Sequence, residues 1–450
     1  MRLVGFAGKS AEMTPQSNFM VVAPVPRDQL SGLKNLLASM TDPPGMAKPG
    51  NGLFPFEQFD TLHYARFAIL DDQTVSDFKE AGERIPDYQP SLAFLGDCDE
   101  PGDAFLVKAA DRAGAGLCEI FSRCKDPPSA GNLLAWMRRH SLSPAANYVN
   151  YLGRTVRQIQ REAALRAAVV AYLKDHPPDA DNPQATRRAV IDFVHASKLE
   201  LPVEAPTPPA WHVRNLIDFL IPVVALIVVI GLVIKFPWLL ILLLLALAIF
   251  VVLLRWYEKT EPEIIRQPTD QHTRVLAELE DHDVTNQFTV LGSVKPGWFR
   301  RLLLIVVFAG IGWGARHVYT RGHLARVRSI HFARWVYLDK GRRRVMFASN
   351  YDGSLDSYMD DFINKVGFGL NLAFGSGLGY PRTNWLICDG SKEEQKFKYT
   401  LRRHQVPSQV WYKAYPGLTA YDLGRNTRVR QGIEASAMSD AEIRAWLRDL

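Results

Sequence analysis

The chain has 450 residues, of which 47% are hydrophobic, and a formal net charge of +6. This length accommodates two domains of ordinary size plus further segments, with enough apolar residues for well-packed cores. The positive charge is mild and includes no lysine/arginine block, which argues against nucleic-acid binding and is compatible with an anionic membrane surface. The four cysteines lack metal-ligand spacing, and free thiols favour a reducing compartment.

The two halves of the chain contain the same short motifs. Four of them recur in the same order: residues 18–22 at 286–291, 63–67 at 331–335, 94–103 at 347–356 and 114–117 at 367–370. Self-similarity of this kind indicates a repeated structural unit. We therefore expect two copies of one fold, separated by the segment between them.

The first copy is expected to contain a strand, a helix, two strands and a second helix. Strands are predicted over 19–23, 62–70 and 92–96. The first helix begins at Pro26, because proline suits the first turn of a helix, and the second begins near Pro101.

Two apolar runs in the middle of the chain predict membrane-spanning helices. Residues 216–234, interrupted only by Asp218, and residues 236–254 are each close to the roughly 20 residues that cross a bilayer as a helix. Pro237 cannot continue the first helix, so a helical hairpin is predicted that returns the chain to its starting side. Before it, basic amphipathic helices are predicted over 147–173 and 185–198, facing either solvent or anionic lipid.

The basic residues around this hairpin predict its orientation. Lys235 alone lies at the connecting loop, whereas the outer ends carry Arg214, Arg255, Lys259 and Arg266. Cytoplasmic flanks are enriched in lysine and arginine. We expect a protein that crosses the cell membrane twice and has both large domains in the cytoplasm.

A third apolar run, residues 302–315, is too short to span a bilayer at 14 residues. Its place in the repeat matches an amphipathic helix of the first copy, around residues 30–40. It is therefore predicted to be the first helix of the second copy, either buried or lying along the membrane surface.

The second copy is expected to end with a helix and a strand. Apolar residues follow a helical period over 355–366, and a strand over 384–388 would complete a βαββαβ unit, the ferredoxin-like arrangement. A helix over 391–404 and a strand over 410–415 follow. The predicted fold is α+β, with two duplicated ferredoxin-like units and an inserted transmembrane hairpin. Its predicted divisions are a first unit at 1–146, a helical linker at 147–212, the hairpin at 213–257, a second unit at 270–390 and a C-terminal α/β extension at 391–450.

The strand motif that both copies share contains a histidine and an arginine, His63 with Arg66 and His331 with Arg334. Side chains alternate along a strand, so each histidine is expected to face away from its arginine. The two could grip one ligand together only if the strand contained a bulge.

The acidic motif places Asp99 in register with Asp352, just before a helix. A carboxylate there accepts backbone N–H groups, so a helix cap is expected, with an ion pair to Arg334 as a second structural role. Catalysis is the alternative. Because both copies keep these residues and an active site needs only one, the structural interpretation is favoured.

His404 has no counterpart in the first copy. It shares a helical face with Phe397 and Leu401, so it is expected to point inward. A core or capping histidine is one interpretation, and an axial haem ligand is the other.

Four segments of the C-terminal half carry a family resemblance: IHFARWVYLD at 330–339, FASNYDGSLDSYMDDF at 347–362, GYPRTNWL at 379–386 and VWYKAYPGLT at 410–419. They resemble an uncharacterised family of bacterial membrane-associated proteins, some described as peroxidase-like. The paired ferredoxin-like units are also distantly similar to the dimeric α/β-barrel superfamily, which includes dye-decolorising peroxidases and chlorite dismutases.

The resemblance implies a haem peroxidase-like oxidoreductase. In that reading Asp352 is the acid–base residue, Arg334 the charge stabiliser and His404 the iron ligand. The peroxidase loop Gly-x-x-Asp-Gly keeps its Asp-Gly at 352–353 but has Ser349 at the first glycine. The alternative is a non-enzymatic module or scaffold at the membrane surface that binds lipid or a small molecule, with membrane lipid and a second copy of the chain as partners.

Overall fold

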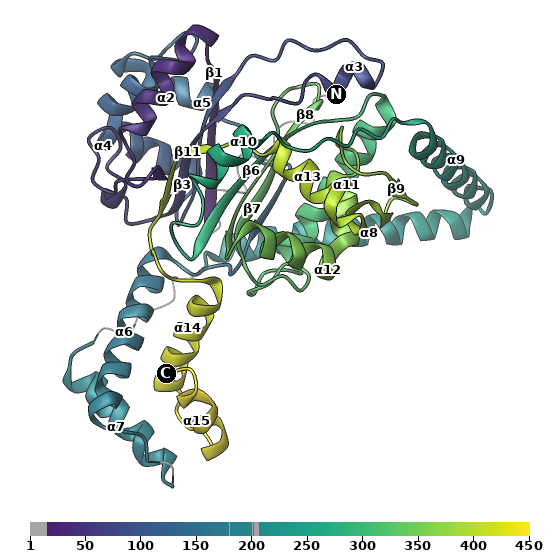
Figure 1. Ribbon diagram of the computed structural model, residues 1–450. Helices are drawn as coiled ribbons and strands as arrows, with labels where there is room; N and C mark the ends of the chain where they lie inside the picture. The colour runs from purple at the N-terminus through teal and green to yellow at the C-terminus, as the bar shows by residue number, and fades with distance from the viewer. Residues whose placement is uncertain (1–15, 180, 200, 202–206) are drawn as a thin grey trace.

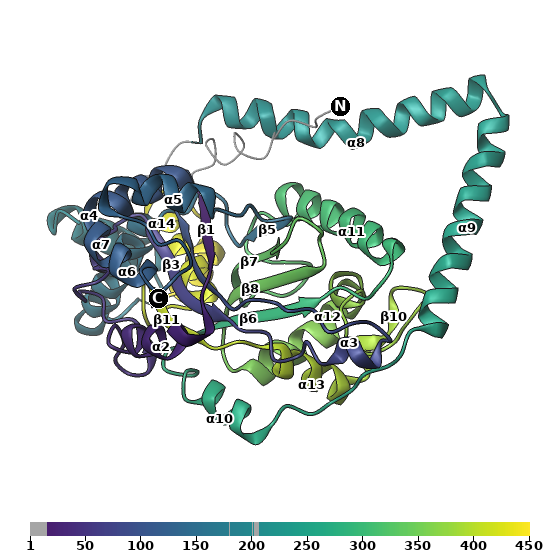
Figure 2. The ribbon, with the colours of Figure 1, turned by 90° about the horizontal axis from the view of Figure 1, so that it is seen from above.

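The computed structural model describes residues 16–179, 181–199, 201 and 207–450. It is a mixed α+β structure in which two antiparallel sheets lie face to face between two layers of helices (Figures 1 and 2). The first sheet has the order β1 (Ser17–Pro24), β4 (Ser91–Cys98), β3 (Leu62–Leu70), β11 (Ser408–Lys413) and the short parallel strand β2 (Gly45–Met46). The second has the order β5 (Ala146–Val149), β7 (Ile330–Tyr337), β8 (Arg344–Asp352) and β6 (Thr285–Ser293).

The two halves of the chain exchange one strand each. β11, near the C-terminus, pairs antiparallel with β3 of the first half, and β5, from the first half, pairs antiparallel with β7 of the second. Without this exchange β3 and β7 would leave unpaired N–H and C=O groups, which is costly for a buried strand. The halves are therefore interlocked rather than tethered.

The strand predicted over 384–388 is not part of the second sheet. β9 (Thr383–Asn384) and β10 (Cys388–Asp389) instead form a separate two-stranded ribbon. The prediction was wrong because residues 385–387 form the turn of this ribbon. The fourth strand of the second sheet is β5, so strand pairing within each half alone does not build the predicted βαββαβ unit.

Alternating side chains divide each sheet between an outer core and a shared inner layer. In β1, Phe19 and Val21 face helices α2 (Leu30–Ala38), α4 (Gly102–Phe121) and α5 (Leu133–Arg139). Helices α11 (Trp298–His317), α12 (Leu355–Phe374) and α13 (Glu394–His404) cover the second sheet. The sheets meet over small and aliphatic residues: Met20, Ala68, Leu70, Ala93, Leu95, Leu291, Val336, Met346, Ala348 and Val406.

Two local irregularities occur in both halves. The register shifts between Leu62 and Tyr64 in β3, and between Ile330 and Phe332 in β7. Helix α4 leaves helical geometry at Ala113, and α12 does so at Val366. The order of elements and these irregularities agree with the predicted repeat, while a duplication of ferredoxin-like units stays a prediction.

Four helices form a module below the sheets (Figure 1). They are α6 (Val156–Asp175), α7 (Pro183–Ala196), α14 (Ala420–Glu434) and α15 (Asp440–Leu447), which share one apolar core. Inside it, Arg430 donates to Glu162 at 2.8 Å and joins α14 to α6. The predicted helix over 147–173 begins only at Val156, because β5 occupies the start of that segment.

Three helices are long and apolar enough to cross a membrane: α8 (Pro209–Lys235), α9 (Trp238–Thr260) and α11. The apolar stretches of α8 and α9 are 0% and 6% buried, whereas that of α11 is 33% buried against the second sheet. α8 and α9 do not pack side by side as the predicted hairpin does; they splay apart from their junction near Pro237 (Figure 2). Most side chains along α8 and α9 are exposed, because little of the described chain packs against these two helices.

The remaining elements are short. They comprise α3 (Asp77–Glu80), α10 (Asp270–Ala277) and the 3-10 turns Arg27–Gln29, Phe56–Gln58, Ala130–Asn132 and Gly390–Lys392.

Strand exchange predicts that neither half folds alone. We expect fragments 1–207 and 208–450, expressed separately in detergent, to show no cooperative thermal transition, because β3 and β7 lose their partners. Co-expressed, the fragments should copurify and regain the transition, which circular dichroism would follow. A cooperative transition in the first fragment by itself would contradict this interlocking.

Candidate functional site

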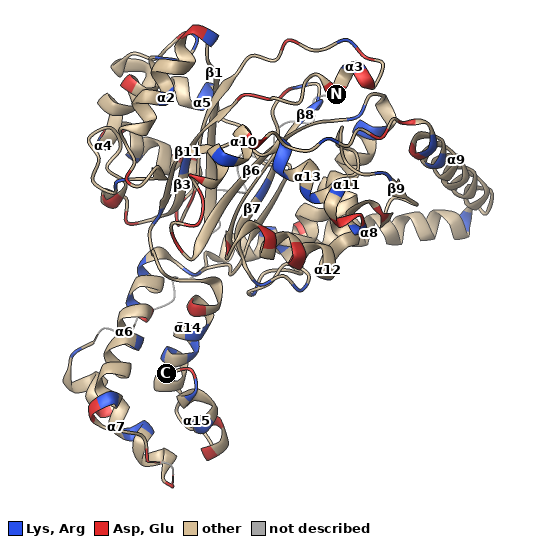
Figure 3. Ribbon diagram, viewed as in Figure 1, with Lys and Arg blue, Asp and Glu red and all other residues tan. Residues whose placement is uncertain are grey.

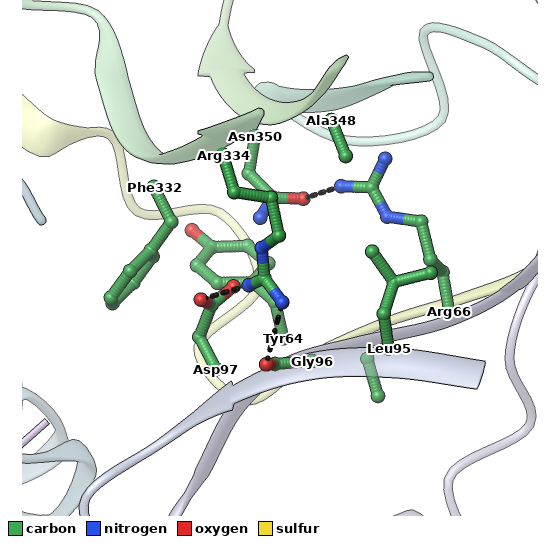
Figure 4. Close-up of a pocket in the computed structure, with 10 residues that line it drawn as sticks. Tyr64, Arg66, Leu95, Gly96, Asp97, Phe332, Arg334, Ala348 and Asn350 are labelled. Carbon is green, nitrogen blue, oxygen red and sulfur yellow. Dashed lines mark hydrogen bonds and ion pairs between the residues drawn. The ribbon is translucent and has the colours of Figure 1, made fainter. Parts of the chain in front are cut away.

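Two arginines cross the layer between the sheets in opposite directions (Figure 4). Arg66 leaves β3 and donates to the carbonyls of Phe288 and Ser349 at 3.1 and 2.9 Å, and to the Asn350 side chain. Arg334 leaves β7 of the second sheet and enters the first.

Arg334 makes the matching contacts in the first sheet. It donates to the carbonyls of Phe19 and Gly96 at 3.2 and 3.1 Å, and forms an ion pair with Asp97. Arg334 and Asp97 are each about 97% buried. Both arginines thus use the same strand positions of the opposite sheet, and each needs that sheet to satisfy its donors.

The charges in this layer are not balanced. Among the described residues, the layer contains two guanidinium groups but only one carboxylate, Asp97. The equivalent position in the second sheet is the neutral Asn350. Burial, followed by the neighbouring Arg334, lowers the pKa of Arg66 to about 9. Burial raises the pKa of Asp97, and the neighbouring guanidinium groups, Arg334 above all, oppose that effect. Between the arginines lies a space of only about 10 Å³, lined by Tyr64 among others, so this cluster holds the sheets and offers no room for an organic substrate.

Because positive charge is in excess in this layer, removing a carboxylate and adding one should have different effects on stability. Asp97→Asn should lower the free energy of unfolding by about 3 kcal/mol, because it leaves Arg334 buried without a counter-charge. Asn350→Asp should be tolerated within about 1 kcal/mol, since the added carboxylate meets an excess of positive charge. Urea unfolding in detergent measures both. Equal losses of unfolding free energy in the two variants would show that side-chain shape, rather than charge, determines the stability of this layer.

Each half also contains a histidine–aspartate pair that reaches the helical module. His63 Nε2 lies 2.8 Å from Asp99, whose second oxygen accepts the N–H of Val156 at 2.9 Å. His331 Nε2 lies 2.7 Å from Asp352, whose second oxygen accepts the N–H of Ala420 at 2.7 Å. Val156 and Ala420 are the first residues of α6 and α14. Both carboxylates therefore neutralise the positive end of a helix.

Both aspartates bind at the start of a helix, but the helices and the ion-pair partner differ from those expected. Asp352 was expected to cap the helix that follows it and to pair with Arg334. It instead pairs with His331 and contacts α14, while Ser354 caps α12 and Arg334 pairs with Asp97. Sequence reasoning could not choose these partners, because α14 lies 68 residues away.

The strand bulge brings each histidine toward the opposite half. His63 is the extra residue between Leu62 and Tyr64, and its ring lies 5.3 Å from that of Phe332 in the second sheet. With Nε2–H donated to Asp99, the other ring nitrogen accepts from the Tyr415 hydroxyl at 3.2 Å. The bulge therefore interrupts the expected alternation of side chains along the strand. His63 and Arg66 nevertheless contact different protein groups.

The Asp352 contacts predict a measurable local effect. Asp352→Asn should cost about 1–2 kcal/mol, through the weaker bond to His331 and the lost charge at the start of α14. Limited proteolysis should then cut α14 and α15 before the sheets. Asp103→Asn is the control, because its ion pair with Arg138 is exposed and contributes less. Unchanged protection of α14 in Asp352→Asn would contradict the capping role.

His404 points inward, as expected, but it lines neither the space between the two arginines nor the apolar cavity of the second half. Its Nδ1–H donates to the Leu291 carbonyl at 2.9 Å, and burial lowers its pKa. Nε2, the atom that would bind iron, has no hydrogen-bond partner among the described residues, and a Cβ at Gly379 would lie 3.0 Å from it. Gly379, with φ +83°, lies against the imidazole ring. The site does not fit haem, because there is no space for a porphyrin between Nε2 of His404 and Gly379.

The larger cavity lies within the second half, between α11, α12, α13 and the outer face of the second sheet. Its volume is about 420 Å³, and its lining is almost wholly apolar. Phe288 and Phe347 contribute from the sheet, and Phe397 and Leu401 from α13. Gly310 of α11 and Phe368 of α12 also line it, and both are exposed at its edge.

The three residues of the peroxidase hypothesis are not brought together at either cavity. Arg334 borders only the small space between the sheets, and neither Asp352 nor His404 lines either of the two. No group of three metal-binding side chains occurs in the part of the chain that the structure describes. The apolar cavity of the second half and Asp97 were not predicted from the sequence. The available signal for Asp97 was a carboxylate that directly follows the apolar residues 92–96 of its strand.

No family model matches the chain, and no curated protein or solved structure matches it either.

Proposed function

We propose that this chain is a membrane-anchored protein of two duplicated ferredoxin-like units, with both large domains in the cytoplasm, that binds one apolar molecule in its second unit. The single observation that carries the proposal is the apolar cavity of about 420 Å³. Binding sites for small molecules are concave and mostly apolar, from roughly 300 Å³ upward. A cavity of roughly 150 Å³ already binds benzene, so this one suits an acyl chain or a comparable hydrocarbon.

The position of the cavity supports a ligand from the bilayer. Its wall includes α11, which contacts α8 through the Phe219 and Trp313 rings, 5.5 Å apart, and through the Arg316–Asp218 ion pair at 2.6 Å. An apolar molecule in the membrane would therefore lie next to the cavity wall. The predicted orientation, with basic residues outside the two membrane helices, places this wall at the cytoplasmic surface.

A peroxidase-like enzyme is the second hypothesis, and it rests on the family resemblance. Against it, Asp352 and Arg334 already bind protein groups through their polar atoms, and His404 faces Gly379. A catalytic acid–base group must reach a substrate atom. The absorption spectrum of the protein purified from membranes tests this hypothesis, and a Soret band that is lost in His404→Ala would favour it over lipid binding.

Filling the cavity should abolish ligand binding without unfolding the protein. At Gly310 a Cβ meets no atom within 4 Å, so Gly310→Phe adds a ring to the space without a backbone clash. Replacing a helical glycine also removes an entropic cost of folding. We expect mass spectrometry to detect a bound lipid in gently purified wild-type protein and not in the variant. The variant should also bind a fluorescent fatty acid at least tenfold more weakly.

Gly231→Phe in α8 is the matched control, since a Cβ there also meets no atom within 4 Å and Gly231 does not line the cavity. It should retain the wild-type lipid content and affinity. Equal binding by wild type and Gly310→Phe, with unchanged thermal stability in both, would contradict the proposal.

A further inference from the structure

Helix α11 contacts both α8 and α9, at its two opposite ends. At its C-terminal end, Arg316 and Trp313 contact Asp218 and Phe219, in the first half of α8. At its N-terminal end, Phe299 stacks 5.1 Å from Tyr257, close to the end of α9. In Figure 2, α8, α9 and α11 outline a triangle whose apex is the junction of α8 and α9. α11 is the side opposite that apex.

One side of α11 remains uncovered. Trp298, Leu302 and Val306 are 58%, 50% and 62% exposed, and they follow one another at intervals of four residues along the helix. Its other side packs on the second sheet through Leu304 and Phe308. Residues four apart lie on the same helical face, so the uncovered residues form a continuous apolar stripe.

A second apolar feature is fixed to the end of α9. Trp385 and Ile387 are 54% and 47% exposed, and they lie in the turn of the β9–β10 ribbon. Trp385 and Leu386 have φ of +55° and +67°, which bulky residues rarely adopt.

The buried carboxylate of Glu258 holds this turn. It accepts the backbone N–H groups of Trp385 and Leu386 at 3.1 and 2.7 Å, and Arg255 lies over the Trp385 ring at 4.6 Å. Glu258 and Arg255 belong to the last turns of α9. The unfavourable backbone therefore displays two apolar side chains to the outside, beside the end of a membrane helix.

Basic residues lie beside these features. α8 and α9 are uncharged along most of their length (Figure 3). Arg255 of α9 and Arg316 of α11 pair with Glu258 and Asp218, and Lys259 of α9 and Arg301 of α11 supply further positive charge. Tryptophan at the boundary of an apolar segment, with arginine and lysine beside it, is typical of the membrane–water interface.

We propose that the α11 stripe and the 385–387 turn form one surface that docks on an anionic bilayer, with α11 parallel to the membrane plane rather than across it. The occupant of this surface is lipid, because it is continuous with the uncovered faces of α8 and α9. The proposal rests on the anchoring part of the proposed function and is independent of a ligand in the cavity.

The native cysteines allow a direct test in full-length protein. Cys98 and Cys124 are buried and Cys388, one residue beyond the turn, is exposed, so Cys118→Ser leaves Cys388 as the accessible site. A polarity-sensitive fluorophore on Cys388, or on Val306→Cys with Cys388→Ser, is measured in nanodiscs that contain phosphatidylglycerol. Gly131→Cys, also with Cys388→Ser, is the control, because a Cβ there meets no atom within 4 Å and the residue is exposed in the turn Ala130–Asn132 of the first half.

We expect brominated lipids to quench the labels at 306 and 388 several-fold more than the label at 131, with iodide showing the reverse order. In sealed vesicles, an impermeant maleimide should reach Trp298→Cys and Val318→Cys from the same side. Labelling of these two positions from opposite sides would mean that α11 crosses the bilayer, and would overturn the proposal.

Failure of this proposal is distinguishable from failure of the anchoring. If the protein resists carbonate extraction but its 306 and 388 labels behave like the label at 131, α8 and α9 are anchored and the docking surface is refuted. Labels shielded from iodide yet unquenched by brominated lipid, together with a doubled mass, would assign the surface to a second copy and likewise refute it. Release by carbonate would refute the anchoring itself.

Discussion

The whole structure depends on the exchange of two buried arginines across a dry layer between the sheets. A guanidinium group without partners in such a layer would cost several kcal/mol. Arg66 and Arg334 avoid this cost only because each reaches carbonyls and a side chain of the opposite sheet. Together with the exchanged strands β5 and β11, this requirement makes the two halves one folding unit.

The same short strand segments also position the helical module. Three residues before each arginine, a bulged histidine orients an aspartate, and that aspartate binds the first N–H of α6 or α14. The histidine–arginine motif therefore joins three layers within four residues: its own sheet, the opposite sheet and the helices below. This structural demand accounts for the presence of the motif in both halves.

Local sequence patterns predicted most strands and helices, because alternation and helical period depend on neighbours along the chain. β3 was predicted with its observed ends, Leu62 and Leu70. Strand exchange could not be read this way, since the pairing of β11 with β3 depends on residues more than 300 positions apart. Residues 384–388 look like a strand by composition, yet Glu258 binds their backbone into a turn. The cavity likewise depends on residues from six separate elements, three strands and three helices.

The outer faces of the two sheets are packed differently. Over the first sheet, α2 has nine residues, and stacked phenylalanines such as Phe67 and Phe94, with centroids 4.4 Å apart, fill the core. At the corresponding place in the chain order, α11 has twenty residues, extends to both membrane helices and leaves a cavity beneath it. A longer apolar helix needs a partner for the face that the sheet does not cover, and the space below it needs an occupant. Under the proposed function a bilayer supplies both, and the half that departs from tight packing is then the half that meets it.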